Sequence, residues 1–129
     1  MGFFKVKAKD VMLGKNEVKS IRPNQKIATA KLVMSRNNIG GLPVIDENNE
    51  LLGFLTLRDL HITPLSGGFE VKELMTKELV TAKPDTPIKE IAKEMIETGI
   101  QRIPIINNEG KLEGLITQTS IIKVVGNLL

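Results

Sequence analysis

The sequence repeats itself after 61 residues. When the chain is shifted along itself by that interval, residues 23–60 lie over residues 84–121 without a gap. The identical pairs are Pro23 and Pro84, Ile27 and Ile88, Met34 and Met95, Ile39 and Ile100, Pro43 and Pro104, Ile45 and Ile106, Leu51 and Leu112, Gly53 and Gly114, and Thr56 and Thr117. Repeated units usually bury their apolar faces against one another, and 129 residues suffice for one compact module. We therefore expect two copies packed sheet against sheet with pseudo-two-fold symmetry.

Each copy begins with a short β-like stretch, at Val18–Ile21 and at Leu79–Ala82, and continues into an amphipathic helix. The helix in the second copy has apolar residues at the i, i+3, i+4, i+7 and i+8 positions, and the first copy is similar but less regular. The apolar positions are Ile88, Ile91, Ala92, Met95 and Ile96 in the second copy and Ile27, Ala30, Val33 and Met34 in the first.

Capping residues predict where these helices begin and end. The first helix is expected to start at Asn24 and to close at Asn37-Asn38. The second is expected to start at Thr86, with Pro87 at its first helical position, and to close at Gly99.

A β-hairpin and a short helix complete each copy, which gives the order β-α-β-β-α and an α+β (α/β) fold class. The strands are predicted at Leu42–Ile45, Leu51–Thr56, Ile103–Ile106 and Leu112–Thr117, and the final helices at Leu57–His61 and Gln118–Val125. Pro64–Gly68 is rich in Pro, Gly and Ser and is interpreted as the linker. The predicted organisation is one module over residues 1–129, with repeat 1 at about 9–62, the linker at about 63–69 and repeat 2 at about 70–125.

Composition removes several classes of chemistry. The chain has no cysteine and one histidine, which excludes disulfides, thiolate catalysis, cysteine-built zinc sites and His-rich metal sites. His61 lies where a helix is predicted to end, and a cationic residue is common there. The net charge of +3 permits an anionic partner, but 3% aromatic residues argue against a nucleic-acid stacking platform. The chain has no apolar run long enough to span a membrane. We therefore expect a cytoplasmic protein that does not associate with membranes.

One motif in the first copy crosses a strand-to-helix junction. Residues 53–59 have the pattern Gly-x-x-Thr-x-x-Asp. The Thr56 hydroxyl would lie beside the backbone N–H groups of a helix start, where phosphate can bind, and Asp59 is one turn later, placed to accept from vicinal sugar hydroxyls. Gly53 leaves room for a close backbone approach. The structural alternative is that Thr56 caps the helix and Asp59 is its first-turn acid.

This motif, the Gly-x-Pro-Val strand at residues 41–44 and the duplicated β-α-β-β-α order together resemble a CBS (cystathionine β-synthase) domain pair, also called a Bateman module. The resemblance covers residues from about Lys9 to Val125. It implies a flat disc whose clefts between the paired motifs bind adenosine compounds such as AMP, ADP, ATP or S-adenosylmethionine. It also implies that two discs commonly dimerise.

By this resemblance, Asp59 would hold the ribose hydroxyls, Thr56 the phosphate, and Arg58 would add positive charge. The purine would lie between the early strand around Ser20 and Ile21 and the backbone of Gly41, Leu42 and Pro43. In the second copy the equivalents are Thr117 and Ser120, with Thr81, Arg102, Ile103 and Pro104 around the base. Ser120 replaces the ribose carboxylate, so the second cleft is expected to bind more weakly or to select another ligand. Two interpretations of Arg102 remain open: it is a solvated residue at a strand edge, or it contacts the phosphate.

Two main functions remain open at this stage. The first is a regulatory module, with no catalytic cofactor and no reaction of its own, that senses an adenosine compound and acts on an unidentified effector protein. The second is a structural module that mainly dimerises. Nucleic-acid binding through the lysines near the start is a weaker alternative, and catalysis is weaker still because Asp46 and Glu47 lie in a turn. We expect a homodimer whose interface uses the stripe Ile88, Ile91 and Met95 and the tail Ile121, Ile122, Val124 and Val125.

Overall fold

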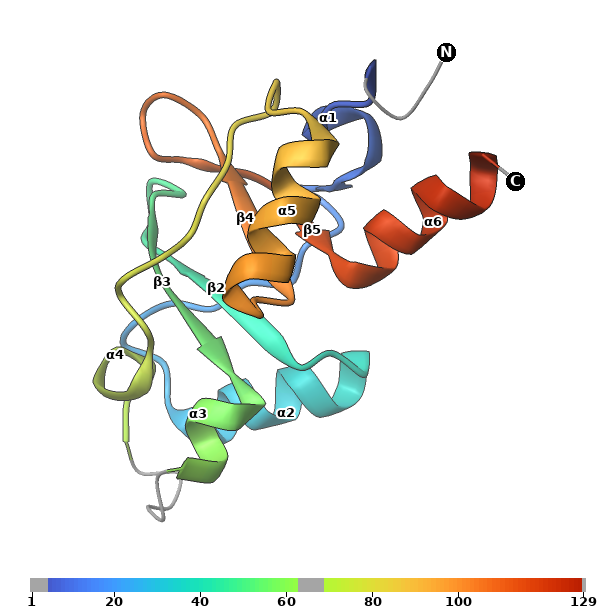
Figure 1. Cartoon of the computed structure of the whole chain (residues 1–129). Helices are drawn as coiled ribbons and strands as arrows, with labels where there is room; N and C mark the ends of the chain where they lie inside the picture. Colours follow the sequence, from blue (N-terminus) through green and yellow to red (C-terminus); the bar gives the residue numbers. More distant parts are fainter. Residues whose placement is uncertain (1–4, 63–68, 129) are drawn as a thin grey trace. The chain divides into compact units, whose positions relative to one another are not determined.

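The computed structural model describes residues 5–62 and 69–128, which form two compact units of mixed helix and strand (Figure 1). The first-copy unit consists of residues 19–79, and the second-copy unit consists of residues 80–129 together with residues 1–18. Each copy of the repeat is therefore completed by the segment that precedes the other copy in the sequence. The predicted linker at Pro64–Gly68 lies outside the described residues.

The elements follow the repeat. The first-copy unit contains α2 (Ile27–Asn37), β2 (Gly41–Ile45), β3 (Leu51–Thr56), α3 (Leu57–Ile62) and α4 (Val71–Leu74). The second-copy unit contains α1 (Ala8–Val11), β1 (Leu13–Gly14), α5 (Ile88–Thr98), β4 (Arg102–Ile106), β5 (Leu112–Thr117) and α6 (Gln118–Leu128). Strands β2 and β3 form an antiparallel pair, and β1, β5 and β4 form a three-stranded antiparallel sheet in that order.

Both predicted hairpins are confirmed, and the same turn chemistry builds them. The Asp46 carboxylate accepts hydrogen bonds from the amides of Asn48 and Glu50, at 2.8 and 2.9 Å. The Asn107 side-chain oxygen accepts in the same way from Glu109 and Lys111. Each turn closes through a left-handed residue, Asn49 with φ 66° or Gly110 with φ 80°. The predicted bounds of β3 and β5 match the structure, and β2 and β4 each begin one residue earlier than predicted.

The helix ends agree with the sequence, but the helix starts do not. Asn38 and Gly99 close α2 and α5 in the left-handed conformation, as expected. The predicted starts at Asn24 and Thr86 are wrong, because α2 begins at Ile27 and α5 at Ile88, and neither has a side-chain cap. The first helical amides are satisfied by main-chain oxygens of the completing segments: Ile27 N–H donates to Phe69 and Ile88 N–H to Val6.

The predicted opening strands reduce to single bridges. Ile21 pairs in parallel with Val44, and Ala82 pairs in the same way with Ile105. Each bridge is flanked by main-chain hydrogen bonds to the neighbouring hairpin strand, such as Ile21 N–H to the Pro43 carbonyl at 3.0 Å. Within these stretches the pairing with β2 and β4 is made by Ile21 and Ala82, and neither stretch forms a strand of its own.

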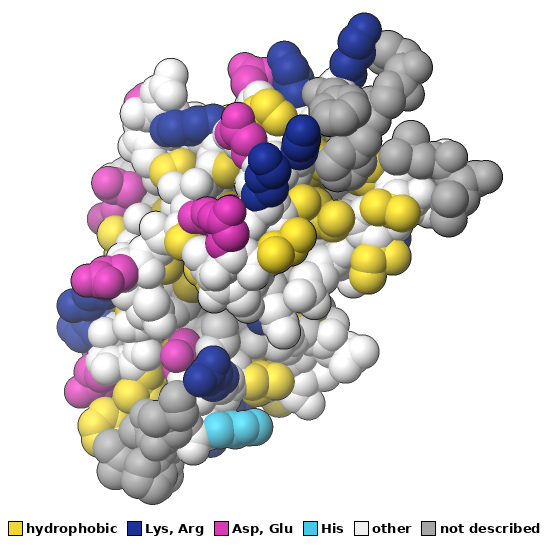
Figure 2. All heavy atoms as spheres, in the orientation of Figure 1, with side chains coloured by type: hydrophobic (Ala, Val, Ile, Leu, Met, Phe, Trp, Pro, Cys, Tyr) yellow, Lys and Arg dark blue, Asp and Glu magenta, His cyan; other side chains and the backbone are white. Residues whose placement is uncertain are grey.

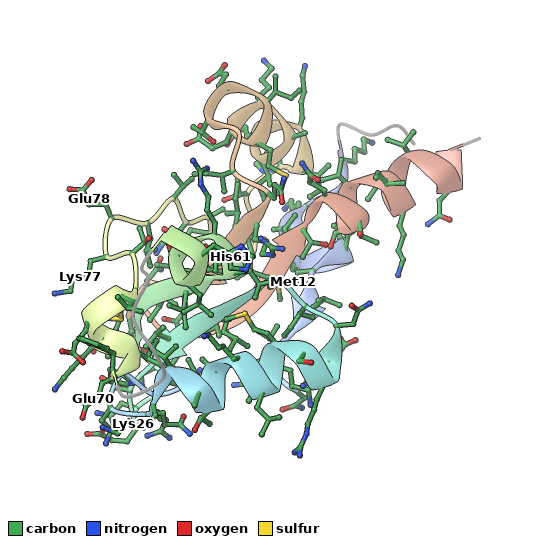
Figure 3. The ribbon with its side chains drawn as sticks, turned by 90° about the horizontal axis from the view of Figure 1, so that it is seen from below. Met12, Lys26, His61, Glu70, Lys77 and Glu78 are labelled. Atoms are coloured by element: carbon green, nitrogen blue, oxygen red, sulfur yellow. The ribbon has the colours of Figure 1, made fainter. Side chains whose placement is uncertain are left out.

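Main-chain bonds hold each completing segment in place. In the first-copy unit, Val71 N–H donates to Gln25 and Lys72 N–H to Pro23. Lys26 and Glu70 form a bridge there, and Figure 3 shows their side chains in the same corner of the unit. In the second-copy unit, Ala8 N–H donates to the Thr86 carbonyl and Lys9 N–H to Pro84, both at 2.9 Å.

In the second-copy unit, an exposed ion pair lies beside the main-chain bonds of Ala8 and Lys9. The ammonium of Lys9 lies 2.9 Å from the Asp85 carboxylate, and that of Lys7 lies 3.7 Å away. The hydrogen bond and charge of Lys9 hold the pKa of Asp85 below its usual value, and Asp85 raises the pKa of Lys9. The pair forms above the pKa of Asp85 and is lost as the pH falls through it. Because both groups are solvated, it is a minor contribution.

Each unit has its own core. The first-copy core includes Ile27, Ala30 and Met34 of α2, as the apolar pattern predicts. The second-copy core includes Ile88, Ile91 and Met95 of α5. Ile96 was expected on the same face, but 82% of it is exposed. Ile88, Ile91, Met95 and Val124 are all buried, so the predicted dimer stripe is wrong for these four residues.

Candidate functional site

The strand-to-helix junction of the first copy is closed by reciprocal hydrogen bonds. Thr56 N–H donates to the Asp59 carboxylate at 2.8 Å, and Asp59 N–H donates to the Thr56 hydroxyl at 3.2 Å. This is a capping box, so the structural alternative for these two residues is realised. Asp59 is half-buried, whereas Arg58 is exposed.

The second copy has the same junction without the carboxylate. Thr117 N–H donates to the Ser120 hydroxyl and Ser120 N–H donates to the Thr117 hydroxyl, both at 3.2 Å. The two hydroxyls are also 3.2 Å apart, and Ser120 is buried. Serine therefore replaces Asp59 in the cap but brings no negative charge.

The amides of the first junction are already used by the chain. Besides the two capping bonds, Leu57 N–H donates to the Gly40 carbonyl at 2.9 Å. The expectation of free N–H groups at this helix start is thus wrong for residues 56, 57 and 59. An anion here could still use the Thr56 hydroxyl and the exposed Arg58 side chain.

Gly53 permits a close backbone approach, as predicted, and the approaching segment belongs to the chain itself. A Cβ at Gly53 would lie 2.8 Å from both the Met75 sulfur and the Thr76 carbonyl oxygen. At the equivalent Gly114, a Cβ would meet the Leu13 carbonyl oxygen and would lie 2.6 Å from the Met12 sulfur. Both glycines therefore serve the packing of the completing segments.

Strand register places the beginnings of β2 and β4 beside these junctions. Gly41 lies opposite Thr56, and Arg102 lies opposite Thr117. Gly41, Leu42, Pro43, Ile103 and Pro104 are buried, while Arg102 and Ser20 are half-buried. Ile21 is buried and its amide is bonded to Pro43, so the Ile21 amide is committed to the fold.

A pocket of about 200 Å³ opens in the second-copy unit beside α5. It is lined by Val80, Thr81, Ala82, Thr86, Glu90, Ile91, Glu94 and Ile103. Two predicted base-contact residues, Thr81 and Ile103, are thus brought together, whereas Arg102, Pro104, Thr117 and Ser120 are not in its lining. Typical sites for whole small molecules measure roughly 300–1,000 Å³, so this volume suits a group the size of a base.

Sequence reasoning missed Thr86, Glu90, Ile91 and Glu94 as pocket residues. Thr86 was interpreted as a helix cap, and Ile91 as part of the apolar stripe expected at a dimer interface. A signal was nevertheless available, because Glu94 is four residues after Glu90 and three after Ile91, which are the spacings that share a helix face. Their side chains, from the start of α5, line one pocket with residues 80–82.

Residues 5–62 and 69–128 contain no cluster of three or more His, Asp or Glu side chains that could hold a metal ion. None of the helices in these ranges has the length and apolarity needed to cross a membrane. His61 is exposed in the last turn of α3, where Figure 3 labels it.

Comparison with known proteins gives the family. The model of the CBS domain matches residues 8–62 and 71–127, and the chain therefore belongs to the CBS domain family. It is 38% identical over 106 residues to inosine-5′-monophosphate dehydrogenase of Aquifex aeolicus, covering 81% of this chain and 22% of that enzyme. For the enzyme of Methanocaldococcus jannaschii the identity is 34%, covering 91% of this chain and 23% of the enzyme. The chain thus spans less than a quarter of the length of either enzyme.

Solved structures show the same fold. CBSX2 in complex with AMP superposes with a TM-score of 0.87 at 24% identity, covering 95% of this chain and 97% of that one. The CBS domain pair of protein MJ0100, in complex with 5′-methylthioadenosine and S-adenosyl-L-methionine, gives 0.85 at 24% identity, covering 96% and 98%. These ligands belong to those proteins, and at this identity the likeness concerns the fold.

Proposed function

We propose that this chain is a regulatory module that binds an adenosine compound and acts on a separate protein. The observation that carries the proposal is the pocket beside α5, because it joins Thr81 and Ile103 in a space suited to a base. Family membership adds support, since structural neighbours are described with AMP or with S-adenosylmethionine. The regulated partner is an effector protein of unidentified kind.

The contacts proposed for the ligand follow the family motifs. In the first copy, Asp59 holds the ribose hydroxyls, Thr56 and Arg58 hold phosphate, and the base lies against residues 20–21 and 41–43. In the second copy, the base lies against Thr81, Arg102, Ile103 and Pro104, and the ribose and phosphate lie near Thr117 and Ser120. The capping boxes leave this possible for Asp59, because a carboxylate accepts several hydrogen bonds at once.

The first experiment is a thermal shift with AMP, ATP, S-adenosylmethionine and GMP. A ligand at about a hundred times its dissociation constant stabilises a fold by roughly 2.7 kcal/mol. We expect adenosine compounds to raise the melting temperature by several degrees and GMP to do so less, because main-chain groups present a fixed donor and acceptor pattern to the purine. No shift with any adenosine compound at millimolar concentration would contradict the proposal.

A second prediction concerns the ribose contact. Asp59→Ser copies the junction of the second copy, so it keeps the cap and removes only the carboxylate. If Asp59 accepts from the ribose hydroxyls, the substitution costs about 1.5–3 kcal/mol of binding free energy, or roughly tenfold to a hundredfold in affinity. Ser120→Ala removes at most a neutral bond, about 0.5–1.5 kcal/mol.

Calorimetric titration with AMP measures both affinities. Asp59→Ala is compared with Asp59→Ser because it removes the helix cap as well as the carboxylate. It should lower the free energy of unfolding by about 1 kcal/mol. Equal affinities for the parent and Asp59→Ser would assign Asp59 to the cap alone.

A dimerisation module is the second candidate, and one observation favours it. Ile96, Ile122 and Val125 are exposed by 82%, 68% and 45% in the second-copy unit. Figure 2 shows hydrophobic side chains gathered over α6. We propose that this surface, rather than the buried stripe of α5, forms the contact in a homodimer. Sedimentation at micromolar concentration should give a dimer, and a monomer would contradict the proposal.

A further inference from the structure

Two methionines occupy equivalent places in the two completing segments. Met12, which Figure 3 labels, directly follows α1, and Met75 directly follows α4; both are half-buried. The Met12 amide donates to the Ala8 carbonyl and the Met75 amide to the Val71 carbonyl, both at 2.9 Å. In each segment the methionine therefore ends the short helix, and the residue after it pairs with a strand of the hairpin.

The thioether of each methionine lies against bare main chain. A Cβ on Gly114 would lie 2.6 Å from the Met12 sulfur, and a Cβ on Gly53 would lie 2.8 Å from the Met75 sulfur. A soft, apolar thioether suits this space, and both side chains also pack against the core of their own unit. Each completing segment is thus held to its hairpin in part by packing that needs an apolar sulfur.

The other two methionines within residues 5–62 and 69–128 have the opposite environment. Met34 in α2 and Met95 in α5 are 1% and 8% exposed. An oxidant in water is expected to reach Met12 and Met75 more easily, since oxidation follows exposure. The chain therefore carries an internal comparison, with two accessible methionines in the completing segments and two protected ones in the cores.

We propose that Met12 and Met75 are reversible oxidation sites whose sulfoxides release the completing segments. A lone pair on sulfur attacks one oxygen of hydrogen peroxide, and the S–O bond forms as the O–O bond breaks. The departing hydroxide takes the proton of the attacked oxygen and becomes water. The sulfur loses two electrons and the peroxide gains them. The proposal concerns the fold of each unit and does not depend on the adenosine site.

A sulfoxide does not suit the place that the thioether occupies. Its oxygen accepts hydrogen bonds strongly, and burial of such a group without a donor is unfavourable. The amides that pair beside Met75 are committed, because Phe54 and Thr76 each donate to the other's carbonyl, at 2.9 and 2.8 Å. The oxidised side chain must turn towards water and leave the core, which removes the packing beside the glycine. Reductases specific for the two sulfoxide epimers reverse the change.

Peptide mapping by mass spectrometry, after graded treatment with hydrogen peroxide, tests the accessibility of the four sulfurs. We expect Met12 and Met75 to form sulfoxide roughly tenfold faster or more than Met34 and Met95. Equal rates at the four sites, or faster oxidation of the buried pair, would overturn the proposal. The measurement uses the parent chain, so it decides the point even where a variant folds poorly.

Amide exchange of the oxidised chain tests the release. Exchange at Phe54, at Thr76 and at the residues paired between β1 and β5 should become roughly tenfold faster or more, because these pairs open locally. It should return to the parent's rate after treatment with both reductases. If Met12 and Met75 are oxidised without faster exchange, or if reduction does not restore the rate, the release is wrong.

The variant Met12→Leu with Met75→Leu removes both sulfurs and nearly keeps the volume. It should exchange like the parent and lose the response to peroxide. Met34→Leu with Met95→Leu is the matched control, and it should keep the response. Met1 lies outside the described residues and is present in both variants, so its oxidation cannot account for a difference between them. A response that persists without Met12 and Met75 would refute the proposal.

Discussion

Gly114→Ala is expected to lower the free energy of unfolding of the second-copy unit by about 3 kcal/mol or more, at the upper end of the cost of overpacking. The new methyl group would meet the Leu13 carbonyl oxygen and the Met12 sulfur. A side chain can rotate away from such a contact, but a carbonyl oxygen in a sheet moves only with its strand. We therefore expect β1 to leave β5, which would be seen as fast amide exchange at residues paired in that register.

Gly126→Ala is the matched control, since it makes the same chemical change inside α6, where a Cβ would meet no atom within 4 Å beyond its chain neighbours and the nearby helix backbone. Its effect should be between zero and a stabilisation of about 1 kcal/mol, because glycine is a poor helix former. Chemical denaturation of both variants gives the two free energies. Similar stabilities would show that the close approach at Gly114 is relieved without cost.

Removal of residues 1–14 is expected to unfold most of the second-copy unit. The deletion takes away α1 and β1, including buried Ala8 and the partly buried Val6, Val11 and Met12 that pack against the core. Burial of an aliphatic side chain contributes about 1.5–3 kcal/mol, so the loss is on the order of 5 kcal/mol. The whole stability of a small domain is about 5–15 kcal/mol. Amide exchange should show fast exchange across β4 and β5 and slower exchange in β2 and β3.

A synthetic peptide of residues 5–18 should restore the truncated chain when it is added in trans, since main-chain bonds and packing hold that segment. The variant Lys7→Ala with Lys9→Ala is the control, because it keeps the segment and removes only solvated ion pairs. It should melt close to the parent. Full protection of β5 in the truncated chain without peptide would contradict the prediction.

Local sequence patterns predicted the local parts of this fold. β3 and β5 matched their predicted bounds because β-branched strands flank a turn whose Asp46 or Asn107 bonds to its own backbone. The left-handed caps at Asn38 and Gly99 were predicted because Asn and Gly adopt this conformation readily at the end of a helix.

What was missed depends on partners far away in the sequence. Helices α1 and α4 have four residues each and β1 has two, too few for any periodicity to show. The starts of α2 and α5 were misplaced because carbonyls of Phe69 and Val6 cap them instead of side chains. Within the candidate site, Thr81 and Ile103 were predicted to contact the base, whereas the charges of Glu90 and Glu94 were overlooked because α5 was considered only for its apolar face.

Each unit includes a segment that precedes the other copy in the sequence. This arrangement affects when each unit can fold during synthesis. Synthesis runs in the N-terminal to C-terminal direction, so α1 and β1 leave the ribosome before the other elements described, yet β5, which pairs with β1, ends only at Thr117. At roughly 5–20 residues per second, that interval is about 5–20 s. The first-copy unit is complete once Leu79 has emerged, well before the second. The segment that holds α1 and β1 therefore waits for β5 during this interval, and its apolar residues remain without their native partners throughout that time.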